Sequence, residues 1–197
     1  MRNCNYKMNQ KFQQQKEKQL EMKDNSSIGE WDEEIKKLCE KINRKKEYYT
    51  TSSCSGRIVL IKQAEKKQGG LFLFRTHKKI NFKQLKNELL KAIKTNKTDL
   101  VYFRQEPCIL HVACASLAGA QNLLDSAKLA GWKNSGIMAS SSRIVLEMRS
   151  TEFIQMPIIN LGKMLVDDKF LKLLVKEANR KLERTFSKIK KLEKLLL

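Results

Sequence analysis

The chain has 197 residues, and its 40 Lys and Arg against 21 Asp and Glu give a formal net charge of +19 at pH 7. This length suits one ordinary hydrophobic core, and the charge favours a polyanionic partner such as a nucleic acid. The sequence has no lipidation motif, no signal-peptide core and no apolar run near the roughly 18 residues that span a membrane, so we expect a cytoplasmic or nuclear protein without a membrane partner.

The first half of the chain predicts a polar arm, a helix and a group of strands. Residues 1–26 are rich in Lys and Gln and predict a basic arm or frayed helix, whereas 27–197 are expected to form a single domain. A capping-box spacing at 27–30 and an apolar stripe after it predict a helix over 29–44. Asn81 is expected to cap a second helix. The strands expected before it lie at 47–52, 57–62 and 71–76.

The second half predicts two more helices and several strands. Ser116 is expected to cap a helix that runs to about residue 130, and Asp167 to cap one that runs to the end of the chain. At about 1.5 Å per residue this last helix is about 40 Å long, so its far end should project or pack on the N-terminal arm. The expected strands lie at 99–105, 108–114, 136–140, 143–149, 152–158 and 164–166.

Short groups of strands that alternate with helices predict an α+β fold. The sheet is expected to be mixed or antiparallel, open or barrel-like, with a long C-terminal helix beside it. No G-x-G-x-x-G motif follows a strand, so the sequence does not support the doubly wound Rossmann fold.

Positive charge is concentrated between Lys62 and Lys97, where eleven basic residues stand against two acidic ones. Such a segment suits a surface that follows RNA phosphates, and we expect Lys78, Lys79 and Lys83 to contact RNA. The alternative is a lysine-rich face that is only solvated.

The segment Thr50 to Arg57 reads TTSSCSGR and places hydroxyls, a thiol and a glycine between two strand-like segments. Its backbone can approach a ligand closely, and Arg57 offers a planar donor fork for a carboxylate or phosphate. The alternative is a polar hairpin loop without a function. Cys54 and Arg57 are too close together in sequence for the phosphate loop of a cysteine phosphatase.

Two other segments carry reactive or polar side chains. In an extended strand Cys108 and Cys114 share one face and His111 lies on the other, so we expect core packing of the cysteines and no metal site. Folding does not account for Asn134 and Ser135, which can recognise a ligand edge by donor and acceptor pairing.

These segments occur in the order found in the tRNA wybutosine-synthesising methyltransferase family, which the chain resembles from about Trp31 to its C-terminal helix. The motifs are TTSSCSGRIVLI, the triplet Thr76-His77-Lys78, ILHVACASLAGAQNLLDSAKLAGWKNSGI, RSTEFIQMPI and LVDDKFLKLLVKEANRKLER. The resemblance implies an atypical α+β fold and a methyltransferase that uses S-adenosylmethionine. It also implies the substrate: a ring nitrogen (N4) of a 4-demethylwyosine-type tricyclic guanosine derivative beside the anticodon of phenylalanine tRNA.

The resemblance implies pocket residues through the same motifs. Those expected to bind the cofactor are Ser52, Ser53, Cys54, Gly56, Arg57, Val112, Asn134, Ser135, Gly136, Ser150 and Thr151. Either His111 or His77 is expected to accept a proton from the ring nitrogen, and Arg57 binds either the cofactor carboxylate or an RNA phosphate.

Tyr48, Tyr49 and Trp132 are candidates to stack on the tricyclic base, with core packing as the alternative role of each. Two other functions stay open from the residues alone. The chain could be a non-catalytic RNA-binding module, or a structural subunit that docks a partner through its C-terminal helix. The sequence does not predict an oligomeric state.

Overall fold

A computed structural model describes residues 2–21, 31–63, 69–139 and 143–196 of the protein. The chain divides into two compact units. Unit 1 contains Met1–Ser55, Cys108–Thr151 and Phe186–Leu197, and unit 2 contains Gly56–Pro107 and Glu152–Thr185. The single domain expected over residues 27–197 stays a prediction.

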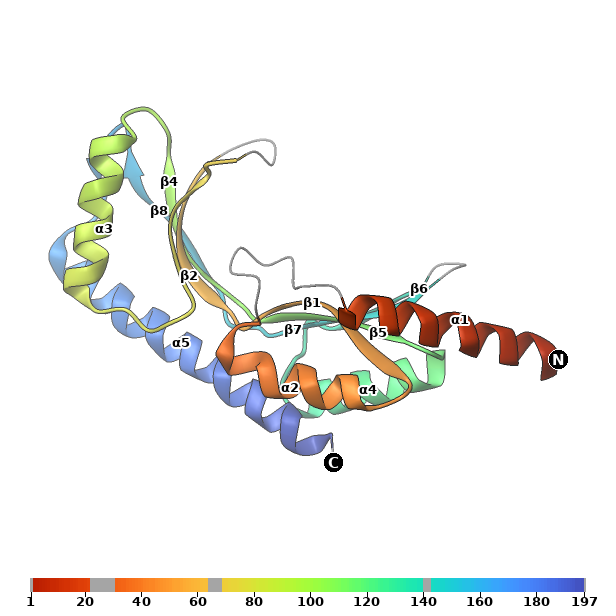
Figure 1. Ribbon diagram of the computed structural model, residues 1–197. Coiled ribbons are helices and arrows are strands. Elements are labelled where there is room, and N and C mark those ends of the chain that lie inside the picture. The colour runs from red at the N-terminus through yellow and green to blue at the C-terminus, as the bar shows by residue number, and fades with distance from the viewer. Residues whose placement is uncertain (1, 22–30, 64–68, 140–142, 197) are drawn as a thin grey trace. The chain divides into compact units, whose positions relative to one another are not determined.

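Unit 1 is built on a four-stranded antiparallel sheet in the order β1–β5–β7–β6 (Figure 1). Helix α1 (Arg2–Glu21) lies on one side of this sheet, and α2 (Glu33–Arg44) and α4 (Leu117–Leu129) lie on the other. The strands are β1 (Tyr48–Cys54), β5 (Ile109–Cys114), β6 (Gly136–Ala139) and β7 (Ile144–Arg149).

The core of unit 1 fills the space between the sheet and helices α2 and α4. Alternate strand residues such as Leu110 and Val112 point into it, because successive side chains of a strand face opposite ways. The last turns of α5 (Asp168–Leu195) add Ile189 and Leu192 to the same core. The far end of the C-terminal helix is therefore buried in unit 1, and the expectation that it projects or packs on the N-terminal arm was wrong.

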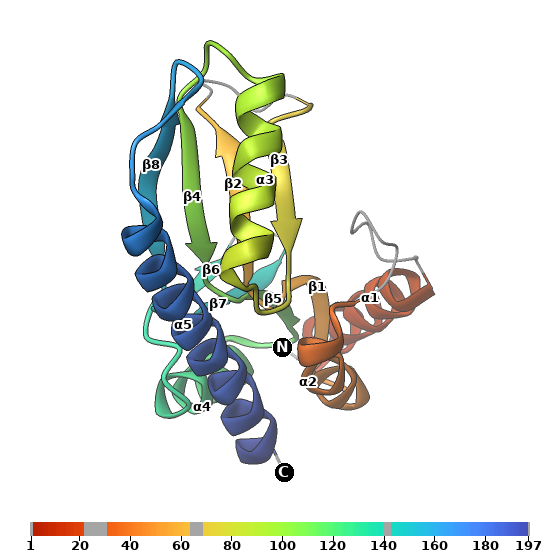
Figure 2. The same cartoon turned by 90° about the vertical axis from the view of Figure 1, so that its left-hand side faces the viewer.

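Unit 2 contains a five-stranded antiparallel sheet in the order β3–β2–β4–β8–β9. Its long strands are visibly curved in Figure 1, and α3 (Phe82–Thr95) lies across one face of the sheet in Figure 2. Leu60 and Phe103 of the sheet and Leu85 and Leu89 of α3 are fully buried. The strands are β2 (Arg57–Lys62), β3 (Phe72–Thr76), β4 (Val101–Glu106), β8 (Ile154–Asn160) and β9 (Lys163–Met164).

The predicted helix caps are confirmed. Asn81 Oδ1 accepts a hydrogen bond from the backbone N–H of Gln84 at 2.8 Å, and Ser116 Oγ accepts one from that of Gly119 at 3.1 Å. Asp167 Oδ1 accepts one from the backbone N–H of Phe170 at 2.7 Å. The α+β fold is confirmed as well, with antiparallel pairing in both sheets.

Several element boundaries differ from the prediction, among them those of β4, β8 and β9, which were expected at 99–105, 152–158 and 164–166. Helix α2 begins at Glu33 and not at residue 29, while the predicted capping box at 27–30 lies outside the described residues. Strand β1 continues to Cys54, because Ser53 and Cys54 pair with Leu110 and Ile109 of β5. The predicted polar arm is helical over Arg2–Glu21.

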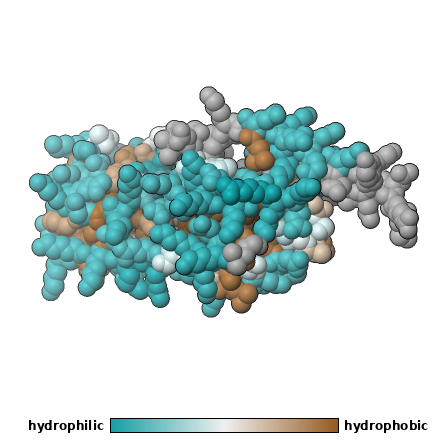
Figure 3. Space-filling view, turned by 60° about the horizontal axis from the view of Figure 1, so that its bottom comes forward, coloured by the Kyte–Doolittle hydropathy of each residue, from teal (hydrophilic) through white to brown (hydrophobic). Residues whose placement is uncertain are grey.

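Most of the surface visible in Figure 3 is hydrophilic, and hydrophobic residues form separate patches on it. Among the described residues, no helix has the length and apolar character that crossing a membrane requires.

Candidate functional site

A β-bulge in β1 sets the geometry of the candidate site in unit 1. Thr50 pairs with Val112 and Ser52 pairs with His111, so Thr51 is an extra residue opposite β5. Bulges of this kind re-aim a side chain and are common beside active sites. Without the extra residue, Thr51 would face His111 and Ser52 would point toward the core.

Ser52, His111 and Glu147 form a hydrogen-bonded array across β1, β5 and β7. Ser52 Oγ lies 2.8 Å from His111 Nδ1, and His111 Nε2 lies 2.9 Å from Glu147 Oε2. An ionised carboxylate only accepts, so in a neutral ring Nε2 carries the proton and Nδ1 accepts from the Ser52 hydroxyl. The His111 and Glu147 side chains are 26% and 38% exposed, so the array is open to solvent. Sequence reasoning found Ser52 and His111 but missed Glu147.

Two further predicted residues lie beside this array on the same sheet. Gly136 of β6 pairs with Glu147 of the neighbouring strand β7, and a Cβ atom added to Gly136 would meet nothing within 4 Å. Cys54 pairs with Ile109, one step along β1 from Ser52, and its thiol is free and partly buried. Ser53, which lies between Ser52 and Cys54 in β1, turns toward the core, where its Oγ is buried and has no hydrogen-bond partner among the described residues.

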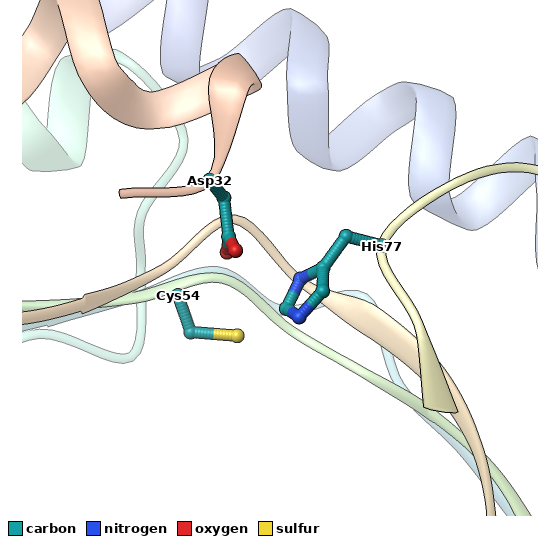
Figure 4. A group of neighbouring side chains, drawn as sticks. All are labelled: Asp32, Cys54 and His77. Atoms are coloured by element: carbon teal, nitrogen blue, oxygen red, sulfur yellow. The ribbon is translucent and has the colours of Figure 1, made fainter. Parts of the chain in front are cut away.

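Asp32 anchors the end of the signature segment. Its Oδ2 accepts a hydrogen bond from the backbone N–H of Ser55 at 2.7 Å, and Figure 4 shows its carboxylate beside Cys54. Asp32 precedes α2 but makes no side-chain cap to that helix. In a sequence, an Asp just before a helix is expected to cap that helix. The sequence therefore gave no separate indication that Asp32 binds the backbone of Ser55.

Asn134 and Ser135, both predicted to bind the cofactor, lie in the loop before β6. Of the two, Ser135 forms hydrogen bonds that hold this loop together. Ser135 Oγ donates to the carbonyl of Trp132 at 2.6 Å and accepts from the backbone N–H of Arg149 at 3.1 Å. Its hydroxyl therefore closes the turn. The neighbouring Asn134 is exposed, and its carboxamide is available to a ligand.

Three other predicted cofactor residues have structural contacts in unit 1. Ser150 is fully buried, and its Oγ accepts from the backbone N–H of Cys108 at 3.3 Å. Thr151 Oγ1 accepts from Lys188 Nζ at 2.9 Å. Val112 is fully buried in the core, so its side chain offers no surface to a ligand.

The three aromatic candidates for stacking are buried, in agreement with their alternative role in the core. Tyr48 donates its hydroxyl to the carbonyl of Gly119 at 2.8 Å, and burial raises the pKa of Tyr48. Tyr49 packs against Phe12 of α1, with ring centroids 5.1 Å apart. Trp132 Nε1 donates to the carbonyl of Lys188 at 3.2 Å.

Cys108, directly before β5, and Cys114, its last residue, have the arrangement expected from strand alternation. Cys108 and Cys114 belong to the hydrophobic core, whereas His111 lies on the opposite face of the sheet. Burial raises the pKa of the Cys114 thiol to about 12, so the thiol stays protonated near neutral pH.

In unit 2, His77 contacts the residue that precedes β2. Its Nδ1 lies 3.0 Å from the carbonyl oxygen of Gly56, and Gly56 has a φ of +95°, where a side chain would be strained. Because a carbonyl only accepts, Nδ1 donates, and a neutral ring then keeps Nε2 as its acceptor. His77, also drawn in Figure 4, thus has a defined tautomer within its own unit.

Arg57 has a partner that the sequence did not reveal. Its Nε donates to Glu106 Oε2 at 2.6 Å, and its guanidinium lies 5.0 Å from the centroid of the Phe72 ring. Arg57 and Glu106 pair across β2 and β4, which explains why their side chains meet.

The predicted RNA-binding lysines lie at the start of α3 and in the turn before it. Lys78, Lys79 and Lys83 are all exposed, and Lys79 Nζ donates to Glu183 Oε1 at 2.8 Å. Elsewhere in the basic segment, Lys62 pairs with Asp99 at 3.3 Å. Part of the local charge is therefore balanced by acidic residues distant in sequence.

Comparisons with known proteins give the family. The model of the family described as methyltransferase TYW3 matches residues 8–197. The chain is 36% identical to a Thermococcus sibiricus protein named tRNA(Phe) 7-((3-amino-3-carboxypropyl)-4-demethylwyosine(37)-N(4))-methyltransferase, over 92% of each chain. It is 35% identical to a Xenopus laevis protein named tRNA wybutosine-synthesizing protein 3 homolog, over 90% of this chain and 71% of the relative.

Solved structures share the fold. The PH1069 protein of Pyrococcus horikoshii superposes with a TM-score of 0.82 at 30% identity, over 96% of this chain and 98% of that one. A hypothetical protein from Aeropyrum pernix gives a TM-score of 0.69 at 27% identity, over 83% and 98%. The chain belongs to the TYW3 methyltransferase family.

Proposed function

We propose that this chain transfers a methyl group from S-adenosylmethionine to N4 of a 4-demethylwyosine-type base in phenylalanine tRNA, a step of wybutosine synthesis. The observation that carries the proposal is the family match over residues 8–197. The Thermococcus sibiricus relative, named for this reaction, extends over 92% of this chain. The net charge of +19 suits a tRNA substrate.

The polar groups around the signature segment in unit 1 suit such a methyl donor. A ligand with carboxylate, ammonium, hydroxyl and adenine groups needs several hydrogen-bond partners. The exposed residue Asn134 and the partly buried thiol of Cys54 can supply two of them. We assign Cys54, Asn134 and Gly136 to this site. When bound, the donor supplies an electrophilic methyl group on a sulfonium.

The Ser52–His111–Glu147 array provides a path for the proton that N4 loses. Ser52 Oγ accepts the proton of the ring nitrogen while its own hydroxyl proton passes to His111 Nδ1. The imidazolium that results is stabilised by the Glu147 carboxylate 2.9 Å from Nε2. His77 is the other candidate base, through its Nε2, because its Nδ1 is engaged with Gly56. General base catalysis of this kind contributes about 10²–10⁴-fold to a rate.

A transfer assay tests the proposal. The purified protein is incubated with S-adenosylmethionine labelled in its methyl group and with phenylalanine tRNA that carries the demethylated tricyclic base. We expect label in that tRNA, and none in the same tRNA when it carries an unmodified guanosine in place of the tricyclic base. A folded protein that binds the donor but labels neither tRNA would reject the proposed function.

A further inference from the structure

One face of the unit 2 sheet carries arginine and aromatic side chains in register. Val59 of β2 pairs with Arg75 of β3 on one side and with Arg104 of β4 on the other. The next pair along, Leu60 and Phe103, is fully buried, and α3 covers one face of this sheet (Figure 2). Because side chains alternate along a strand, Arg75 and Arg104 lie on the opposite face of the sheet from Leu60 and Phe103.

The guanidinium groups on this face lie over aromatic rings. The Arg57 and Arg75 guanidinium carbons lie 5.0 Å and 5.6 Å from the centroid of Phe72, and that of Arg104 lies 5.7 Å from the centroid of Tyr102. These distances are typical of cation–π contacts. We name these five residues the arginine–aromatic face: Arg57, Phe72, Arg75, Tyr102 and Arg104.

Burial indicates that this face is built to receive a ligand. Phe72 is 42% exposed although it lies in a strand, whereas Val59 beneath the arginines is fully buried. Arg104 Nε is buried and has no hydrogen-bond acceptor in the part of the chain that the structure describes. A buried donor without an acceptor costs free energy, which a bound acceptor would remove.

We propose that the arginine–aromatic face binds an unpaired loop of RNA, with bases stacked on the ring and guanidinium planes and phosphates held by Arg75 and Arg104. Single-stranded RNA presents splayed bases that stack on aromatic and arginine side chains of a sheet, whereas a duplex hides its base faces. The net charge of +19 complements this polyanion. A lipid surface would instead require a broad apolar patch around Phe72, and its neighbours here are cationic.

Only the identity of this RNA, the anticodon loop of phenylalanine tRNA, rests on the proposed function. The face consists of strand residues, whereas Lys83 lies in the first turn of α3. Arg75 and Arg104, which the sequence analysis did not single out, therefore contact the RNA through this face, and the lysines contribute at most a phosphate contact.

RNA binding by point variants tests this inference. Fluorescence anisotropy is measured without S-adenosylmethionine, with an unmodified hairpin that contains the anticodon loop and with a fully paired RNA of equal length. The test variants are Arg75→Ala with Arg104→Ala, the same pair changed to Lys, and Phe72→Leu. The control is Lys169→Ala with Lys176→Ala, which removes two exposed charges from α5 of the same unit.

We expect the Ala pair to weaken hairpin binding about tenfold or more, and the Lys pair and Phe72→Leu to weaken it measurably although charge or apolar volume is kept. The control should change binding much less, and the paired RNA should not distinguish the test variants from the control. Equal losses in test and control variants, or equal losses for both RNAs, would overturn the inference. If the protein with both arginines changed to Ala does not fold, hairpin binding by the Lys double variant and by Phe72→Leu tests the inference. The experiment measures RNA binding and not methyl transfer, so it tests this inference even if the proposed methyl transfer does not occur.

Discussion

Ser52 Oγ lies 2.8 Å from His111 Nδ1 because Thr51 is an extra residue in β1. The bulge turns a serine of the TTSSCSGR signature onto the face where His111 contacts Glu147. A motif that has the composition of a polar loop in the sequence is thus part of a strand, and its Ser52 is hydrogen-bonded to His111.

We predict that Glu147→Gln lowers kcat about 10- to 100-fold and leaves KM for tRNA nearly unchanged, because the amide no longer stabilises the His111 imidazolium. Steady-state methyl-transfer kinetics measure this effect. Glu33→Gln, which changes an exposed acid at the start of α2, is the control and should keep wild-type kinetics. An unchanged kcat in Glu147→Gln would remove the array from the proposed mechanism.

A second prediction concerns the pair formed by Arg57 and Glu106. Arg57→Lys keeps the charge but loses the planar fork, so we expect affinity for the cofactor or for tRNA to fall by about 1–3 kcal/mol. Glu106→Gln removes the charge of the partner while Arg57 stays in place. Because the two side chains are 25% and 20% exposed, we expect a coupling of only about 1 kcal/mol in stability from the double-mutant cycle. If ligand affinity is the same in Arg57→Lys as in the wild type, Arg57 is only a structural residue.

Tyr48 should make stability depend on alkaline pH. Burial raises its pKa in the folded state, so above its ordinary pKa near 10 the unfolded state loses the proton first. Stability is therefore complete below about pH 10 and declines as pH rises further. Urea unfolding at about pH 8 and pH 11 measures this decline, which Tyr48→Phe should reduce while it loses about 1 kcal/mol at pH 8 through the missing bond to Gly119. Equal declines in both proteins would contradict the assignment to Tyr48.

A fourth prediction tests whether residues 27–197 unfold as one domain. Both tryptophans, Trp31 and Trp132, lie in unit 1, whereas Leu85 is fully buried in unit 2. Leu85→Ala should cost about 2–5 kcal/mol. If the domain is single, tryptophan fluorescence and circular dichroism report the same lowered unfolding midpoint, since α5 contributes residues to both units. A wild-type fluorescence midpoint in this variant would establish independent unfolding of the units.

Local signals account for what the sequence predicted well. The caps at Asn81 and Ser116 depend on residues three positions apart, and the apolar stripes on the spacing of a single helix. The partners Glu147 and Glu106 are 36 and 49 residues from His111 and Arg57, and only strand register brings them together. The bulge at Thr51 also depends on pairing with β5. No pattern within one segment could have indicated these contacts.

Mass spectrometry of the tRNA nucleosides tests the central claim most directly. Phenylalanine tRNA that carries the demethylated tricyclic base is treated with the protein and S-adenosylmethionine, and the nucleoside is then fragmented to locate any added methyl group. The account predicts a single added methyl group on N4 of the tricyclic base, and none after treatment with the doubly changed His77→Asn, His111→Asn protein. A methyl group elsewhere in the tRNA, or an unaltered base after treatment with folded wild-type protein, would contradict it.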